Sequence, residues 1–152
     1  MKASAGKRVL MLIENNTYPQ DTRVRYEVGT LVEAGYRVSV ICPRYASQSG
    51  HEKIGEVEVY RYPAPPEAMS PLAYIWEYAY SLVATFILSL VVGIRPGFDI
   101  IHAANPPDTA VLIAMFYKLL GKRFVFDHHD LVPEMYKVRF TDGGNRLIAR
   151  VL

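Results

Sequence analysis

The chain has 152 residues, of which 51% are hydrophobic and 21% are charged, and its formal net charge at pH 7 is +2. This length fits one domain of ordinary size, and so balanced a charge gives no reason to expect nucleic acid as a partner. The single cysteine, Cys42, lies in an apolar run, so we expect a buried thiol and no disulfide framework.

The first predicted elements are a buried strand and an amphipathic helix. Arg8 to Ile13 is a short, continuous apolar run, typical of a strand covered on both faces. The polar residues before it lack the apolar core of a secretory signal, so we expect a cytoplasmic protein. Asp21 is a plausible N-cap for the helix, and Gly35 is placed to end it. Its apolar positions recur at helical spacing: Val24, Val28, Leu31 and Val32.

Two further strands are predicted before the middle of the chain. Arg37 to Cys42 is again short and apolar, and Pro43 stops it. Glu56 to Tyr62 alternates valine with charged or aromatic residues, which predicts a third, more exposed strand. The predicted order to this point is strand, helix, strand, strand.

Pro71 to Ile94 is a long apolar segment with Glu77 as its one charged residue. Its length alone permits a transmembrane helix. A parallel sheet, however, requires a long crossover before its next strand, which we expect at Asp99 to His102. We therefore favour a crossover helix that is partly buried and partly membrane-facing. Its tryptophan and tyrosines are of the type found at bilayer interfaces, which predicts peripheral contact with a membrane.

The last part of the chain continues the alternation of helices and strands. Pro107 to Leu120 predicts a helix, Lys122 to Phe126 a strand, and Asn145 to Leu152 the beginning of another helix. Alternating buried strands and helices are typical of an α/β fold with a doubly wound, Rossmann-like parallel sheet. We expect residues 1–152 to form one such domain.

Three loops that follow predicted strands should meet at one edge of the sheet, where open α/β sheets bind ligands. In the first loop, Arg23 and Arg25 lie near a helix N-terminus and suit a phosphate or carboxylate, although a solvated arginine pair is the alternative. This loop lacks the glycines of a dinucleotide or nucleoside-triphosphate motif, so neither NAD nor ATP hydrolysis is supported. The second loop offers His102, for which a structural role and a ligand contact are both open, and Asn105.

The third loop contains the run Asp127-His128-His129-Asp130. So local a run cannot easily place three ligands around one ion, and we expect no metal site. In an extended chain the two histidines point to opposite sides, so they do not serve one centre together. One histidine that supplies hydrogen bonds or acid–base chemistry, oriented by a neighbouring aspartate, is easier to build.

Taken together, these segments resemble the N-terminal half of family 4 glycosyltransferases, which have the GT-B fold. The resemblance depends on their order and spacing and covers nearly the whole chain. The segments that carry it are Asp21-Thr22-Arg23-Val24-Arg25, Leu31 to Ile41, Phe98 to Ala103 and Asp127 to Glu134.

The resemblance implies two Rossmann-like domains, of which the N-terminal one holds the acceptor and the C-terminal one the nucleotide-sugar. It implies transfer of a sugar, with retention of configuration, in the cleft between them, without a metal and with no cofactor beyond the nucleotide-sugar donor. His129 then matches the family's catalytic histidine, and Asp130 positions it. The implied substrate-binding residues are Asn15, Asp21, Arg23, Arg25, His102, Asn105, Asp127 and His128.

This sequence departs from the family pattern in two places. The first loop lacks the glycine pair often found there, and the sequence ends before the donor domain and its paired glutamates. We therefore expect the acceptor-side domain of a hexosyltransferase of glycan, polysaccharide or glycolipid synthesis, inactive by itself and working with a donor-binding domain. Its acceptor would be a glycan or a lipid-linked glycan at the inner face of the membrane. The alternative is a noncatalytic membrane-docking α/β module that recruits a catalytic partner.

Overall fold

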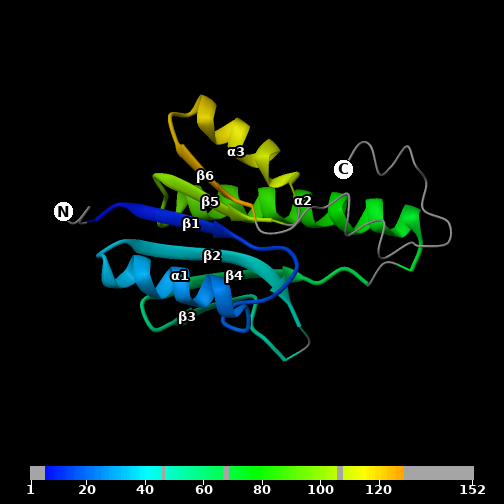
Figure 1. The fold of residues 1–152 in the computed structure, drawn as a ribbon, viewed down its shortest axis with the longest axis horizontal. Helices are drawn as coiled ribbons and strands as arrows, with labels where there is room; N and C mark the ends of the chain where they lie inside the picture. The colour runs from blue at the N-terminus through cyan, green and yellow to red at the C-terminus, as the bar shows by residue number, and fades with distance from the viewer. Residues whose placement is uncertain (1–5, 46, 67–68, 106–107, 129–152) are drawn as a thin grey trace.

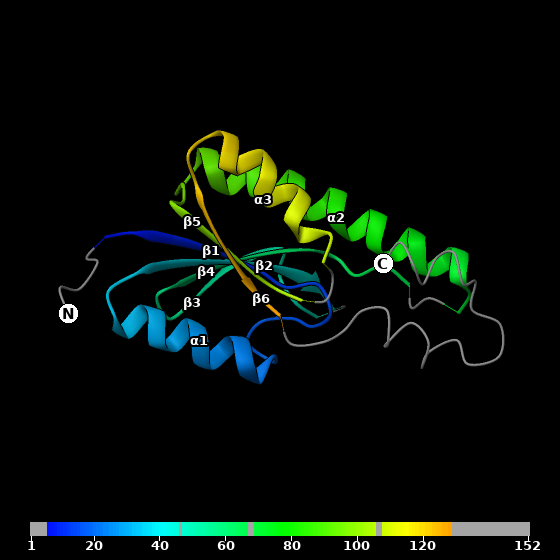
Figure 2. The ribbon, with the colours of Figure 1, turned by 45° about the horizontal axis from the view of Figure 1, so that its top comes forward.

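A computed structural model describes residues 6–45, 47–66, 69–105 and 108–128. A six-stranded sheet forms the middle layer, with α1 on one face and α2 and α3 on the other (Figures 1 and 2). The elements in chain order are β1 (Arg8–Leu12), α1 (Thr22–Glu33), β2 (Arg37–Arg44), β3 (His51–Ile54), β4 (Val57–Pro63), α2 (Pro71–Ile94), β5 (Ile100–Ala104), α3 (Ala110–Leu119) and β6 (Arg123–Asp127).

The strand order is β3-β4-β2-β1-β5-β6. Every neighbouring pair is parallel except β3 and β4, which are antiparallel. From β1 the chain first builds outward through β2 and β4 and then returns to the other side of β1 through β5 and β6. The predicted doubly wound, Rossmann-like sheet is therefore confirmed, with its topological switch point between β1 and β5.

Successive side chains of each strand point to opposite faces of the sheet, which divides the interior into two cores. In β1, Val9 and Met11 face α1, whereas Leu10 and Leu12 face α2 and α3. Because both faces of the sheet are covered, the central strands are continuous apolar runs, as the sequence indicated.

Helix α1 has the predicted ends. The Asp21 carboxylate accepts a hydrogen bond of 3.1 Å from the backbone N–H of Val24, as an N-cap does. Gly35, with φ of +84°, follows the last turn, in the left-handed region that favours glycine. The helix buries Val24 and Val28 against the sheet and leaves most of its other side chains partly or fully exposed.

Helix α2 has the predicted bounds, and it is the crossover from β4 to β5. The Ser70 hydroxyl accepts a hydrogen bond of 3.2 Å from Ala73 N–H at its start, and Pro71 occupies the first turn. Its 24 residues extend for about 36 Å, whereas the strands, of at most 8 residues, are no longer than about 26 Å. Because its C-terminal end adjoins the start of β5, the N-terminal part of α2 projects past the carboxyl edge of the sheet (Figure 2).

The structure corrects two predictions about the strands before α2. It contains a strand that the sequence analysis missed, β3, which pairs with β4 across the turn at Gly55. A polar edge strand carries no apolar run to reveal it. Because β3 covers the outer edge of β4, β4 is mostly buried, and the prediction of a more exposed strand was wrong.

Other boundaries shift by a few residues. The prediction that Pro43 stops the second strand was wrong: β2 runs through it to Arg44, and its last residues pair with β4 beyond the end of β1. Among the described residues, α3 begins at Ala110, later than predicted, and β5 and β6 each begin and end one or two residues later. The predicted helix at 145–152 lies outside the described residues.

We predict that Leu10→Ala destabilises the domain by about 2–5 kcal/mol, because Leu10 is completely buried and its truncation leaves a cavity between β1 and α3 or α2. Leu72→Ala, at a side chain that is 77% exposed, is the matched control and should change the free energy of unfolding by less than about 0.5 kcal/mol. Urea denaturation followed by circular dichroism measures both. Equal decreases in the free energy of unfolding for the two variants would contradict the assignment of Leu10 to the core.

Candidate functional site at the carboxyl edge of the sheet

Strands β1, β5 and β6 end at one edge of the sheet. The backbone N–H of Asn105, just after β5, donates a hydrogen bond of 3.0 Å to the carbonyl of Asp127, the last residue of β6. Since β1 is parallel to β5, the loop that contains Asn15 leaves from the same edge. The predicted meeting of the three strand ends is confirmed for their described parts.

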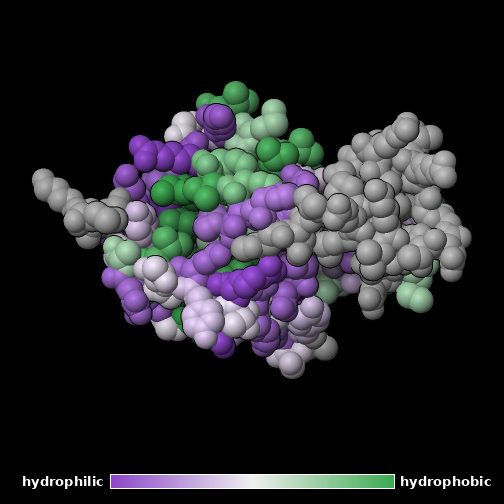
Figure 3. Space-filling model, in the orientation of Figure 1, coloured by the Kyte–Doolittle hydropathy of each residue, from purple (hydrophilic) through white to green (hydrophobic). Residues whose placement is uncertain are grey.

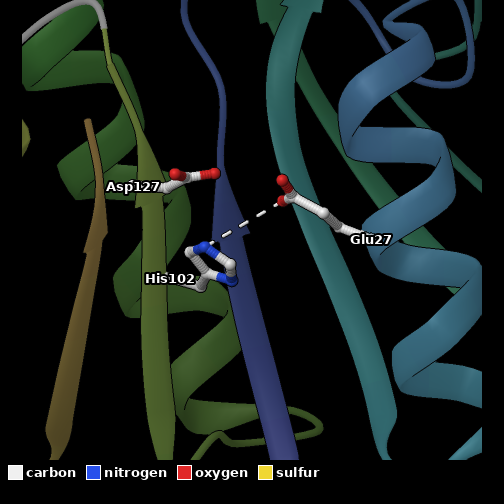
Figure 4. Close-up of side chains that lie close together, drawn as sticks. All are labelled: Glu27, His102 and Asp127. Carbon is white, nitrogen blue, oxygen red and sulfur yellow. Dashed lines mark ion pairs between the residues drawn. The ribbon is translucent and has the colours of Figure 1, made fainter. Parts of the chain in front are cut away.

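Three ionisable side chains converge on the α1 face of this edge (Figure 4). Nε2 of His102 lies 4.0 Å from Oε2 of Glu27, and the side chains are 17% and 30% exposed. The Asp127 carboxylate completes the cluster, in which one nitrogen or oxygen atom of each residue lies within 4.8 Å of those of the other two. We call these three residues the edge cluster.

The topology explains why these residues meet. His102 stands opposite Met11 in the pairing of β5 with β1, and both side chains point toward α1. Glu27 precedes the buried Val28, so it lies on the flank of α1 that turns toward the sheet. The cluster thus lies at the switch point between β1 and β5, where open α/β sheets bind ligands.

An imidazole between two partly buried carboxylates can orient and exchange hydrogen bonds with the hydroxyls of a ligand. It can also take up and release a proton, as histidine side chains do in general acid–base catalysis. The same three residues offer one ligand atom each to a metal ion. Zinc bonds of about 2 Å would require ligand atoms roughly 3.5 Å apart, which is shorter than the 4.0 Å between Nε2 of His102 and Oε2 of Glu27. Our expectation of no metal stays a prediction.

Sequence analysis missed Glu27. It predicted His102 and Asp127 from their place at strand ends, but Glu27 is one of several polar residues on a helix. A signal was present, since Glu27 lies three residues after Val24 and one before Val28 in the predicted apolar stripe. A carboxylate beside that stripe must lie near the sheet.

The other predicted residues of the first loop are less closely grouped. Asn15, Arg23 and Arg25 are exposed, and the Arg25 guanidinium lies over the ring of Tyr26, 5.6 Å from its centroid. Asp21 is only 5% exposed and caps α1. The roles of these four residues in substrate binding stay predictions.

A buried arginine fixes the first loop in place. Arg61 of β4 donates a hydrogen bond of 2.7 Å to the carbonyl of Tyr18 and one of 3.3 Å to the Thr17 hydroxyl, and its guanidinium also pairs with Glu52 of β3. Cys42 packs below the same loop, and burial raises the pKa of its thiol. The buried thiol predicted from the sequence is confirmed.

The second and third loops are described in part. The Asn105 side chain is 1% exposed and donates a hydrogen bond of 3.1 Å to Asp108, which ties the end of β5 to the start of α3. His128 is exposed, with its ring 5.9 Å from that of Phe126. His129 and Asp130, the predicted catalytic residues, lie outside the described residues.

A small pocket opens at the same edge, on the α2 and α3 face of the sheet. Glu14 lines it and accepts a hydrogen bond of 3.0 Å from Ser81 of α2. The remaining lining is mainly apolar and includes Leu12, Leu82 and Ile113. Both faces of the carboxyl edge thus carry a carboxylate.

Comparison with protein families decides which kind of domain this is. Residues 20–152 match the family described as the glycosyl transferase 4-like domain. The chain belongs to that family. The resemblance to family 4 glycosyltransferases noted from the sequence is therefore confirmed, and the domain carries its edge cluster in a fold that binds ligands at this edge.

Solved structures agree with this glycosyl transferase 4-like domain in fold. A sucrose-phosphate synthase from Thermosynechococcus elongatus superposes with a TM-score of 0.60 at 13% identity, covering 93% of this chain and 36% of that one. The C-terminal domain of a hydrogenase from Pyrococcus furiosus superposes with a TM-score of 0.56 at 11% identity, covering 84% of this chain and 95% of that one. The curated proteins yield no match. The domain thus spans about a third of the synthase chain.

Substitutions of Asp21 test its role as the N-cap of α1. We expect Asp21→Ala to lower the free energy of unfolding by about 1 kcal/mol, and Asp21→Asn, which still caps, to leave it nearly unchanged. Thermal or urea unfolding measures both. If Asp21→Asn is as unstable as Asp21→Ala, the carboxylate has a structural role beyond the cap.

Proposed function

We propose that this domain is the acceptor-binding half of a nucleotide-sugar-dependent, retaining glycosyltransferase of glycan, polysaccharide or glycolipid synthesis. The observation that carries the proposal is the edge cluster at the switch point of a domain that belongs to a glycosyltransferase family. Its imidazole and carboxylates suit the hydroxyls of a sugar, which both donate and accept hydrogen bonds.

In this proposal the edge cluster binds the acceptor. His102, held beside Glu27, exchanges hydrogen bonds with the acceptor hydroxyls, and Asp127 accepts a further one. The catalytic residues implied by the resemblance are His129, which approaches the reacting centre, and Asp130, which positions it. Arg23 and Arg25 at the start of α1 favour a negatively charged part of a substrate.

In the proposed reaction a second domain binds the nucleotide-sugar donor, as the resemblance implies. The donor is a substrate, and we propose no other cofactor. An acceptor that is a glycan or a lipid-linked glycan places the enzyme in the cytoplasm at the inner face of the membrane.

We expect Glu27→Gln and His102→Ala, each in the enzyme with its donor-binding domain, to raise the KM for the acceptor at least about tenfold and to leave the KM for the donor nearly unchanged. Initial-rate kinetics with each substrate varied in turn measures this. His51→Ala is the matched control, since His51 is an exposed histidine on β3 that pairs with Glu58. A selective rise of the donor KM would contradict acceptor binding at the edge cluster.

His129→Ala tests the catalytic role implied by the resemblance. We expect turnover to fall by roughly 10²-fold or more, much more than acceptor binding weakens, if the histidine acts in the transition state. Circular dichroism checks that the variant is folded. Turnover like that of the wild type in a folded variant would assign His129 to structure.

The second candidate is a noncatalytic membrane-docking module that recruits a catalytic partner. The observation in its favour is α2, which in the described part of the chain is the one helix long and apolar enough to cross a bilayer. Sugar transfer by the protein together with its donor-binding domain would exclude this candidate. Membrane binding without sugar transfer from any nucleotide-sugar would support it.

A further inference from the structure

Helix α2 carries an apolar stripe on its outside, and three of the five residues that it buries are small and polar. Ser81, Thr85 and Ser89, spaced four residues apart, are all buried against the rest of the domain. Ser81 donates to Glu14, and Ser89 donates a hydrogen bond of 2.6 Å to the carbonyl of Phe86. It also buries Tyr74 and Val92, but a helix that served only as a crossover would keep its apolar side chains to the buried side.

The outward stripe of α2 consists of apolar residues along its whole length. Their spacing averages about 3.7 residues, close to the 3.6 of a straight α-helix. They therefore lie along one side of a straight helix about 36 Å long. The exposed positions of the stripe are Leu72, Trp76, Ala79, Val83, Ile87, Leu90 and Ile94.

Helix α3 extends this surface. It lies beside α2 on the same face of the sheet (Figure 2), with the rings of Phe86 and Phe116 5.2 Å apart. Apart from Lys118, its exposed side chains are again apolar, and hydrophobic residues gather over α3 and β6 in Figure 3. We call the outward stripes of both helices the α2–α3 face, to which α3 contributes Val111, Leu112, Met115, Phe116 and Leu119.

The α2–α3 face is basic at one end. Arg95 follows Ile94 at the end of α2, and Lys118 precedes Leu119 at the end of α3. Ile94 and Leu119 are 86% and 87% exposed, the highest values among the apolar side chains of these two helices. Lys122, just after α3, adds a third cation.

Acidic groups are scarce on the two helices. Glu77 is the one acidic residue of α2, and α3 has none. A surface that combines exposed apolar side chains with lysine and arginine at its end is complementary to anionic lipid, because the cations meet the headgroups while the apolar side chains enter the acyl boundary.

We propose that the α2–α3 face docks flat on a lipid bilayer with anionic headgroups. A bilayer accommodates two adjacent apolar helices in one plane. A left-handed coiled-coil partner would instead require a repeat near 3.5 residues on one helix, which the stripe of α2 does not follow. The inference deepens the peripheral membrane contact proposed above by naming the surface, its second helix and the class of lipid.

Docking in this way orients the edge cluster. Helix α2 projects past the carboxyl edge of the sheet, so the edge opens alongside the membrane plane and close to it (Figure 2). If the proposed function holds, a lipid-linked acceptor has to extend its glycan around this edge, because the edge cluster lies on the α1 face of the sheet, which is turned away from the bilayer. Vesicle binding itself requires no sugar transfer, so its failure and that of the proposed function are distinguishable.

The test is co-sedimentation of the purified protein with vesicles of phosphatidylcholine alone or with 30% phosphatidylglycerol, a composition chosen to be anionic at about the level of cytoplasmic leaflets. We expect stronger binding to the anionic vesicles. Ile87→Asp combined with Leu112→Asp should weaken it about tenfold or more, because both carboxylates enter the apolar part of the face. Tyr45→Glu, at an exposed tyrosine on the loop after β2, is the control and should bind like the wild type.

A second pair of variants tests the basic end. Arg95→Ala with Lys118→Ala should weaken binding to anionic vesicles about tenfold and leave binding to neutral vesicles nearly unchanged. Arg23→Ala with Arg25→Ala removes the same charge from exposed sites on α1, on the opposite face of the sheet, and should have little effect on vesicle binding.

Three results would overturn the proposal. The first is a wild-type protein that does not sediment with either kind of vesicle. The second is that Ile87→Asp combined with Leu112→Asp changes the oligomeric state measured by sedimentation velocity but leaves vesicle binding unchanged. That result would make the face an interface between copies of the chain. The third is protein expressed in cells that carbonate does not release from membranes, which would indicate a spanning helix.

Discussion

The parallel pairing of β1 with both β2 and β5 is the constraint on which the rest of the structure depends. Parallel neighbours align their carboxyl ends, so the loops that follow them leave from one edge. Because the chain turns to opposite sides of β1, α1 covers one face of the sheet and α2 and α3 cover the other. The edge cluster follows from this arrangement: Glu27 comes from the helix after β1, and His102 and Asp127 come from the two strands on its other side.

The same constraint gives α2 its unusual surface. A crossover from β4 to β5 must pass over β2 and β1. A helix of 24 residues is longer than that distance requires. Its buried side presents Ser81, Thr85 and Ser89 together with Tyr74 and Val92, while a stripe of apolar side chains points outward along the whole helix. Folding of the domain therefore leaves apolar area uncovered, and an apolar surface of this extent marks an interaction site.

Buried polar contacts fix the loops around the site. Arg61 joins β4, β3 and the loop after β1 through hydrogen bonds to Tyr18 and Thr17 and its ion pair with Glu52. Asn105 joins β5, β6 and α3 in the same way. Breaking one partner of such a buried network costs more than its net contribution suggests, since the remaining groups lose their hydrogen bonds. Both residues therefore keep the carboxyl edge in a defined shape.

The sequence by itself determined the elements with strong apolar patterns: β1, α1 with its cap at Asp21, and α2 from Pro71 to Ile94. It also placed His102 and Asp127 at strand ends, and the order of its motifs indicated the family. Only the tertiary structure decided the rest. Strand β3 is polar and is held by its pairing with β4, and Glu27 becomes a site residue only because α1 packs across β1 toward β5. The outward direction of the apolar stripe of α2 was likewise beyond local pattern, because periodicity identifies the faces of a helix and packing decides which of them is covered.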